Sequence, residues 1–213
     1  MTVKGVLFDM DGVIADTAKF HYIAWKNAAK TLGIDITESF NEQLKGVSRA
    51  KSLDRILEFG GITLSQERKD ELMANKNSEY VELLDTLTSD DILPGILELL
   101  KTLNSNGIKV SVASISRNAP LIIEKLEIAQ YIDAVANPNH VKESKPAPDI
   151  FIEAARLINI PAEHCVGIED AEAGIESIRR AGVRAIGIGV SGDISLPNTA
   201  ELTFPLVQSA LNP

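Results

Sequence analysis

The sequence predicts an α/β fold with a doubly wound (Rossmann-like) parallel sheet core and an inserted small α-helical cap domain. Short apolar runs of strand length alternate with helical patterns over most of the 213 residues. Such continuous apolar runs are typical of strands that are buried on both faces, as in parallel sheets. One long block with helical periodicity alone follows the first run and interrupts the alternation. We therefore expect a sheet domain that carries a smaller helical insert.

Five apolar runs are predicted to be strands, at residues 5–8, 108–113, 132–136, 165–168 and 183–188. Helical patterns lie between and after them, at residues 95–106, 120–127, 148–159 and 171–181. In each of these patterns apolar residues recur three and four positions apart, which places them on one face of a helix. Strands that alternate with helices in this way indicate a doubly wound parallel sheet.

The inserted block begins near residue 17 and ends near residue 85, and it contains no convincing strand. Trp25 and Leu32 lie on one predicted helical stripe, and further stripes follow. A helical block directly after the first strand indicates a small cap over the sheet. We expect an α/β core (catalytic) domain of residues 1–16 and 88–213, and a helical cap domain of residues 17–87.

Charge and composition exclude several classes of function. Lys plus Arg number 21 and Asp plus Glu number 30, so the formal charge of −9 argues against binding to nucleic acid or to an anionic membrane. No apolar run approaches membrane-spanning length, and the N-terminal residues do not resemble a signal peptide. The single cysteine, Cys165, lies in an apolar run, which predicts a buried thiol and fits a reducing compartment. We expect a cytoplasmic monomer.

Polar side chains follow four of the predicted strands. In chain order these residues are Asp9 and Asp11, then Ser114, then Lys145 in a loop, then Glu169 and Asp170. Each is unremarkable alone, because single acidic residues after strands are often solvated loop ends. Since ligands of an open parallel sheet bind beyond the carboxyl ends of its strands, we expect these residues to meet at one edge.

These residue types together indicate magnesium-dependent phosphoryl transfer. A carboxylate can attack phosphorus to form an aspartyl phosphate, and we assign this role to Asp9. Asp11, two residues on, is the predicted general acid and base. Lys145 and the Ser114 hydroxyl are predicted to bind phosphate oxygens. Mg²⁺ prefers hard oxygen ligands, and its predicted ligands are Asp9, Asp11, Glu169 and Asp170.

The same residues carry a resemblance to a known family. Phe8 to Val13, Ser114, Lys145 with Pro146, and Gly167 to Asp170 resemble, in order, the four motifs of the haloacid dehalogenase-like phosphotransferase superfamily. The match covers the whole predicted sheet domain. The resemblance implies an aspartyl-phosphate mechanism with Mg²⁺, and the helical insert is similar to the small cap of that superfamily.

The insert resembles, more narrowly, the cap of bacterial β-phosphoglucomutases. The segments that carry this resemblance are residues 16–17, 21, 25–26, 41–49, 52–53 and 76–77, together with 113–114, 116–118 and 144–149 outside the cap. It implies interconversion of β-D-glucose 1-phosphate and glucose 6-phosphate through β-glucose 1,6-bisphosphate. The expected partner is therefore a small sugar phosphate.

The resemblance also implies a second phosphate site and a sugar pocket. Arg49, Ser116 and Asn118 would hold the phosphate that is not being transferred. His21 would hydrogen-bond near Asp11 or the sugar, and Lys76 would contact a sugar hydroxyl. The remaining residues of the predicted substrate site are Trp25, Leu44, Lys45, Gly46, Val47, Ser48, Ser52, Ile115 and Arg117.

Two other functions stay open at this point. A small sugar-phosphate phosphatase of the same superfamily would use Asp9, Asp11 and the metal in the same way, but it would not need the Lys45 to Arg49 loop. A non-catalytic phosphosugar-binding protein would not need the acidic motifs. Isomerisation that is stimulated by the bisphosphate would separate the mutase from both.

Overall fold

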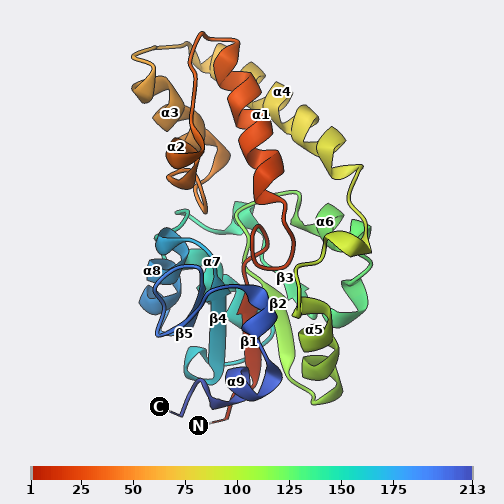
Figure 1. Cartoon of the computed structure of the whole chain (residues 1–213). Coiled ribbons are helices and arrows are strands. Elements are labelled where there is room, and N and C mark those ends of the chain that lie inside the picture. The colour runs from red at the N-terminus through yellow and green to blue at the C-terminus, as the bar shows by residue number, and fades with distance from the viewer. Residues whose placement is uncertain (1, 213) are drawn as a thin grey trace.

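The computed structural model describes residues 2–212, and its centre is a six-stranded parallel sheet (Figure 1). The strands are β1 (Gly5–Phe8), β2 (Lys109–Val112), β3 (Ala134–Val135), β4 (Cys165–Glu169), β5 (Arg184–Ile188) and β6 (Ile194–Leu196). Their order across the sheet is β3-β2-β1-β4-β5-β6. This is the order of a doubly wound fold, in which the ligand crevice lies where the strand order reverses. The predicted fold class is confirmed, and the crevice is expected above β1 and β4.

The register of the central strands sets which residues leave the sheet together. Phe8 of β1 is paired with Val112 of β2 and with Ile168 of β4. The Asp9 backbone N–H donates to the Ile168 carbonyl at 3.0 Å, so the ladder continues one residue past β1. Asp9 and Glu169 therefore leave the sheet side by side at its carboxyl edge.

Helices cover both faces of the sheet. One face carries α5 (Ile96–Ser105), α6 (Ala119–Lys125) and α9 (Phe204–Ser209), and the other carries α7 (Asp149–Leu157) and α8 (Glu172–Arg180). Because successive side chains of a strand point to opposite faces, Val6 and Phe8 pack with the first group and Leu7 packs with the second. Cys165 is buried in the second cluster, as predicted, and burial raises the pKa of its thiol to about 12.

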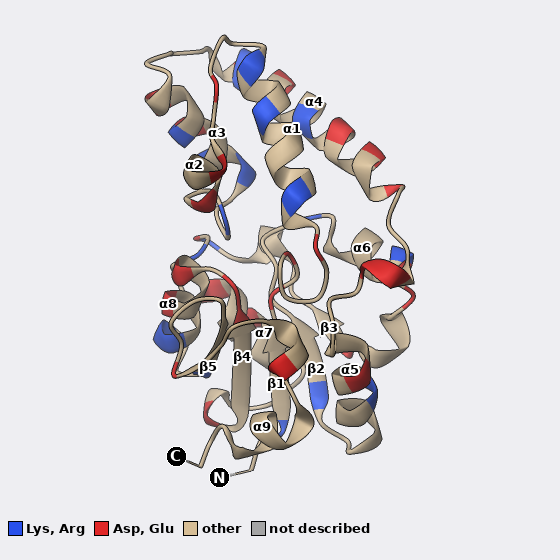
Figure 2. Cartoon of the chain, viewed as in Figure 1, with Lys and Arg blue, Asp and Glu red and all other residues tan. Residues whose placement is uncertain are grey.

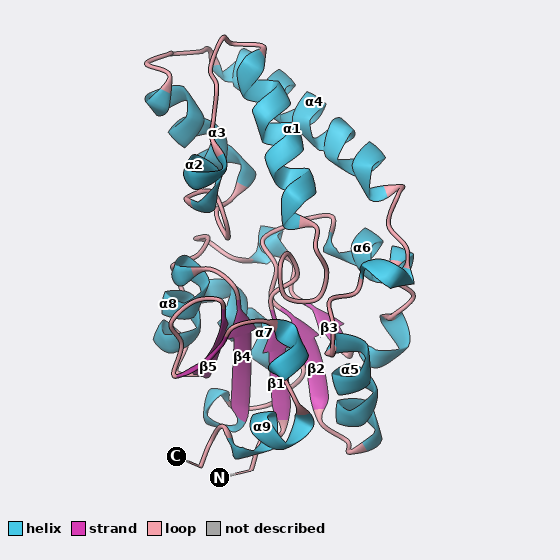
Figure 3. Cartoon of the chain, viewed as in Figure 1, coloured by secondary structure: helices cyan, strands magenta, loops and turns pink. Residues whose placement is uncertain are grey.

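A helical segment lies beyond the carboxyl ends of the strands (Figures 1 and 3). It consists of α1 (Ala18–Lys30), α2 (Glu38–Glu42), α3 (Arg49–Phe59) and α4 (Gln66–Leu84), and we call residues 18–84 the cap. Ser48 and Ser65 begin α3 and α4, and each side chain accepts a hydrogen bond from a backbone N–H of the first turn. Trp25 and Leu53 belong to an apolar cluster within the cap. The proposed division into two domains at these boundaries stays a prediction.

Two elements at the end of the chain were not predicted. β6 is three residues long and pairs with β5, while α9 begins after Thr203 with Pro205 in its first turn. Neither is long enough to show a clear period in the sequence. β3 is also shorter than the predicted 132–136, because it lies at the edge of the sheet and pairs only with β2 at two positions. Within residues 2–212, no helix combines the length and the apolar character that a membrane crossing requires.

Candidate active site

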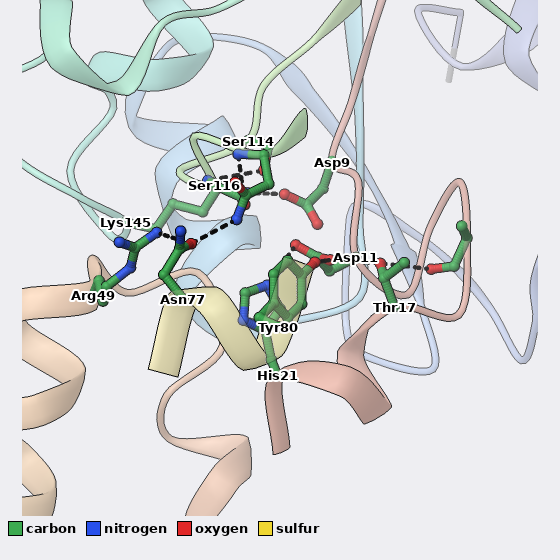
Figure 4. Close-up of polar contacts among 12 residues, drawn as sticks. Asp9, Asp11, Thr17, His21, Arg49, Asn77, Tyr80, Ser114, Ser116 and Lys145 are labelled. Carbon is green, nitrogen blue, oxygen red and sulfur yellow. Dashed lines mark hydrogen bonds and ion pairs between the residues drawn. The ribbon is translucent and has the colours of Figure 1, made fainter. Parts of the chain in front are cut away.

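Asp9 lies at the end of β1 beside a buried lysine. The Lys145 ammonium donates to the Asp9 carboxylate and to Glu169 Oε1, the latter at 2.6 Å. Burial alone would lower the pKa of Lys145, but the two adjacent carboxylates raise it above its ordinary value. Lys145 is therefore a permanent positive charge next to Asp9 (Figure 4), and its role in binding phosphate oxygens stays a prediction.

Three carboxylates form a group that fits a divalent cation. Oxygen atoms of Asp9, Glu169 and Asp170 lie within 4.8 Å of one another. Burial and the neighbouring carboxylates raise the pKa of Asp9 well above its ordinary value, and they raise the pKa of Asp170 to about 7. A cluster with such electrostatic repulsion gains stability from a bound cation, and hard oxygen donors suit a divalent metal.

The turns around this cluster leave no space for larger residues. Gly12 has a φ of +86°, and a Cβ atom built on it would lie 2.4 Å from Asp170 Oδ2. A Cβ atom on Gly174 of α8 would lie 1.9 Å from Glu169 Oε1. Glu169 Oε2 also accepts the backbone N–H groups of Asp170 and Ala171, at 2.6 and 2.8 Å. Close backbone approach therefore holds the carboxylates in place.

Asp11 belongs to a different hydrogen-bonding group. Its Oδ1 accepts from the Thr17 hydroxyl at 2.5 Å and from the Tyr80 hydroxyl at 3.4 Å, and its Oδ2 lies 3.6 Å from His21 Nε2. Burial alone would raise the pKa of Asp11, but His21, Thr17 and Lys76 lower it to about 2. Its carboxylate is not part of the group of three, and the assignment of Asp11 as a metal ligand stays a prediction.

His21 connects Asp11 to the cap helix α4. Its ring stacks on Tyr80 with centroids 4.0 Å apart, and its Nδ1 lies 2.8 Å from Lys76 Nζ (Figure 4). Burial and then the Lys76 charge lower the pKa of His21, which favours the neutral ring. When Lys76 donates to Nδ1, the ring proton lies on Nε2, which faces Asp11. Asp11 is therefore oriented mainly by residues of the cap.

A cavity of about 600 Å³ lies between the cap and the carboxyl edge of the sheet. Among the predicted site residues that line it are Asp9, Asp11, His21, Trp25, Leu44, Lys45, Gly46, Val47, Ser48, Arg49, Ser52, Lys76, Ser114, Ile115, Ser116, Arg117, Glu169 and Asp170. Figure 2 shows acidic segments at the upper strand ends and basic segments in loops that face them. The cavity thus has carboxylates at its base and cations on its walls.

Arg49 is a cation without a carboxylate partner among residues 2–212. Its Nη2 donates to Asn77 Oδ1 at 2.6 Å, and its pKa is lowered by burial and then by the neighbouring Arg117. Arg117 also makes no ion pair with a described residue and lines the same cavity as Ser116. Two adjacent arginines with no acidic partner favour an anion from solution.

Comparison with known proteins identifies the family. The model of the haloacid dehalogenase-like hydrolase family matches residues 3–182. The chain belongs to this family. Within it, the chain is 43% identical to a β-phosphoglucomutase of Bacillus subtilis (strain 168) over 96% of this chain and 94% of the relative. A phosphorylated carbohydrates phosphatase of Thermotoga maritima is 29% identical over 86% of this chain and 84% of its own length.

A solved structure extends the similarity to three dimensions. A crystal structure of β-phosphoglucomutase from Clostridium difficile superposes with a TM-score of 0.96 and 42% sequence identity. The alignment covers 99% of this chain and 97% of that chain. The similarity includes the cap, so this member of the haloacid dehalogenase-like hydrolase family resembles those proteins in both parts of its structure.

Two predicted residues lie beside the cavity and are not part of its lining. Lys145 is fully buried behind Asp9, and the Asn118 side chain donates to Asn77. Sequence reasoning missed Thr17, Asn77 and Tyr80 as site residues. Tyr80 follows Lys76 by four residues, which places both on one face of α4, and this spacing is the signal that was available.

Proposed function

We propose that this chain is a β-phosphoglucomutase, which interconverts β-D-glucose 1-phosphate and glucose 6-phosphate. The observation that carries the proposal is that one cavity has two charged regions that can each hold a phosphate. The carboxylate group, which can hold a cation, lies at the base of the cavity with Lys145 directly behind it. Arg49, which makes no ion pair among residues 2–212, lies on the cap side, and Ser116 lines the cavity from the sheet domain. A bisphosphate intermediate needs one region for each phosphate. The similarity to two β-phosphoglucomutases supports the same assignment.

In the proposed cycle Asp9 carries a phosphoryl group as an aspartyl phosphate. A sugar hydroxyl attacks phosphorus, the new sugar O–P bond forms, the Asp9 O–P bond breaks, and the hydroxyl proton passes to Asp11. The bisphosphate then reorients. Asp9 attacks the other phosphoryl group, and Asp11 returns its proton to the sugar oxygen that leaves. The phosphoenzyme is thereby restored.

The proposal includes Mg²⁺, held by Asp9, Glu169 and Asp170, whose oxygens fit a hard divalent cation. When bound, the ion supplies charge neutralisation for the transferring group. Lys145 adds a fixed positive charge next to Asp9. Thr17, His21 and Tyr80 hold the Asp11 carboxylate at the same end of the cavity.

The cap excludes water from the aspartyl phosphate in this scheme. Lys45 of the cap donates to Asp170 Oδ2 at 3.0 Å, and a Cβ on Gly46 would lie 2.9 Å from Lys145 Cδ, so the cap loop contacts the catalytic lysine. These contacts close the cap loop against the acidic group and Lys145 on one side of the cavity. The cap must open for the intermediate to turn or exchange. We further propose that the enzyme is a cytoplasmic monomer.

A coupled assay tests the proposal. Purified protein with Mg²⁺ is given α- or β-glucose 1-phosphate, with and without β-glucose 1,6-bisphosphate, and glucose 6-phosphate and free phosphate are both measured. We expect isomerisation of the β-anomer that the bisphosphate stimulates, with little phosphate release. Phosphate release that outpaces isomerisation would instead identify a sugar-phosphate phosphatase, the activity named for the Thermotoga maritima relative.

A further inference from the structure

Asn77 lies beside the cavity and accepts hydrogen bonds from both the cap and the sheet domain. Its Oδ1 receives Arg49 Nη2 from the cap at 2.6 Å and Asn118 Nδ2 from the sheet domain at 3.0 Å (Figure 4). Asn77 lies on α4, next to Lys76. A guanidinium and an amide that converge on one oxygen form the arrangement in which these groups bind a phosphate oxygen.

The charge at this position is left uncompensated. Asn77 is neutral, so it satisfies the hydrogen bonds of Arg49 without balancing its charge. Arg117 is close enough to lower the pKa of Arg49, and among residues 2–212 neither arginine makes an ion pair. The region therefore keeps its attraction for an anion while one N–H of Arg49 is engaged by Asn77.

The hydrogen bond to Asn77 directs the Asn118 side chain away from the cavity lining. Arg49 and Ser116 line the cavity, but Asn118 is not among its lining residues, and its side-chain amide donates to Asn77. The Asn118 N–H that Asn77 accepts has to leave Asn77 before that hydrogen can be donated to a phosphate in the cavity. The same holds for the one N–H of the Arg49 Nη2 group that Asn77 accepts.

We infer that Asn77 is a positioning residue that substitutes for the distal phosphate: its amide oxygen accepts hydrogen bonds from Arg49 and Asn118 that the phosphate would accept, and it gives these bonds up when a sugar phosphate binds. This rests on the proposed function, which assigns Arg49, Ser116 and Asn118 to that phosphate. Asn77 aligns the donors of the cap and the sheet domain before binding. It also competes with the phosphate, and so it weakens binding.

If Asn77 both competes with phosphate and aligns its donors, an alanine substitution at this position should raise the phosphate affinity and lower the stability of the protein. Asn77→Ala removes the competing acceptor, so the phosphate affinity rises. The same change removes a bridge between α4 and the residues of the sheet domain, so the ligand-free protein becomes less stable. A residue with a structural role alone would lower both quantities. A residue that contacts the bound phosphate would lower the affinity.

The test is calorimetric titration of the full-length protein with inorganic phosphate in buffer containing a chelator, so that the carboxylate group is without a divalent ion and disfavours the anion. The Kd of Asn77→Ala is expected to fall about fivefold, the effect of one net hydrogen bond. The Kd of Asn77→Asp is expected to rise at least tenfold, because a carboxylate would pair with Arg49 and repel phosphate. The Tm of Asn77→Ala without phosphate is expected to fall.

Two further variants separate the possible failures. Asn75→Ala removes an exposed asparagine from the same helix and should leave Kd and Tm unchanged. Arg49→Ala should abolish phosphate binding. If Arg49→Ala binds phosphate as the wild type does, the assignment of the distal phosphate site is wrong, and the inference falls with it. If Arg49→Ala loses binding and Asn77→Ala leaves Kd unchanged or raises it, the inference about Asn77 alone is overturned.

Discussion

Asp9 and Asp11 are two residues apart, yet they have different electrostatic surroundings. Asp9 is grouped with two more carboxylates and one ammonium group, and burial raises its pKa. Asp11 accepts hydrogen bonds from Thr17 and Tyr80 and faces His21. The nearby His21, Thr17 and Lys76 side chains lower its pKa to about 2. When two carboxylates of one site have different surroundings, their pKa values differ, and they can take different roles in catalysis.

The Tyr80 hydroxyl is expected to contribute to catalysis through Asp11. Tyr80→Phe keeps the ring that stacks on His21 and removes the hydrogen bond to Asp11 Oδ1, which is long at 3.4 Å. We expect kcat to fall about threefold to tenfold, since the lost bond is worth on the order of 1 kcal/mol. A steady-state assay of the isomerisation measures kcat in both proteins.

Tyr22→Phe is the control for that substitution. The Tyr22 hydroxyl donates to the Ile36 carbonyl within the cap at 3.4 Å and makes no hydrogen bond with Asp11. It should leave kcat unchanged. Equal losses in the two variants would mean that the effect comes from cap stability and not from the orientation of Asp11.

Lys76 makes stability depend on pH. Burial and then the Arg49 charge lower its pKa to about 7, whereas an unfolded lysine has a pKa near 10.4. Between these values the unfolded chain binds more protons than the folded chain, so the free energy of unfolding rises with pH, by at most about 1.4 kcal/mol per unit. Below pH 7 both states are protonated and the slope from this residue vanishes.

Urea unfolding at pH 7 and pH 9 tests whether the free energy of unfolding rises with pH because of Lys76. The wild type should gain stability over this interval relative to Lys76→Met, which keeps most of the side-chain volume and cannot titrate. Comparing the two proteins removes the contribution of the other titrating groups that they share. A larger gain in Lys76→Met would contradict the lowered pKa.

At the scale of elements, the strand ends and the first turn of α8 build the acidic group. Parallel pairing of β1 with β4 puts Asp9 next to Glu169, and α8 approaches so closely that only glycine fits at position 174. The sequence predicted this part of the site well, because the carboxyl ends of parallel strands meet wherever the strands pair. The surroundings of Asp11 could not be predicted in this way, because two of its partners, His21 and Tyr80, come from the cap.

Gly174→Ala is expected to weaken metal binding. The new Cβ would lie 1.9 Å from Glu169 Oε1, so the carboxylate or the helix must move. Because residues that hold a metal's ligands in place typically affect its affinity by ten to one hundredfold, we expect the Kd for Mg²⁺ to rise by about tenfold or more. Calorimetric titration with Mg²⁺ measures the change. Glu176→Ala, on the exposed face of α8, is the control and should bind Mg²⁺ as the wild type does.

At the scale of the molecule, ion pairs between residues far apart in the sequence join the cap to the sheet domain. Lys45 pairs with Asp170, and Lys51 pairs with Glu143. The second pair is about half exposed on each side, at 52% and 60%. Exposed pairs of this kind contribute little, because solvent and salt screen them and ordering two long side chains costs entropy.

A double-mutant cycle on Lys51→Ala and Glu143→Ala should therefore give a coupling energy below about 1 kcal/mol. Urea unfolding at low and high salt supplies the four free energies, and the coupling should shrink at high salt. The Glu98 and Lys101 pair within α5 is a matched control that does not cross to the cap. A coupling well above that of the control would mean that Lys51 holds the cap closed.

What the sequence determined by itself is the sheet and the residues at its carboxyl edge. Apolar runs and helical periods are local, and the positions of Asp9, Lys145 and Glu169 follow from them once parallel pairing is assumed. β6 and α9 were not predicted, because elements of three and six residues are too short to show a periodic hydrophobic pattern.

Only the tertiary structure decided how the cap completes the site. Asp11 and Tyr80 are 69 positions apart, and Arg49 and Asn77 are 28 apart, so no local pattern records that they touch. These contacts depend on where α1, α3 and α4 lie over the strand ends, which is set by packing between the cap and the sheet. For that reason the carboxylate at position 11 could be recognised in the sequence as a chemical group, whereas the residues that orient it could not.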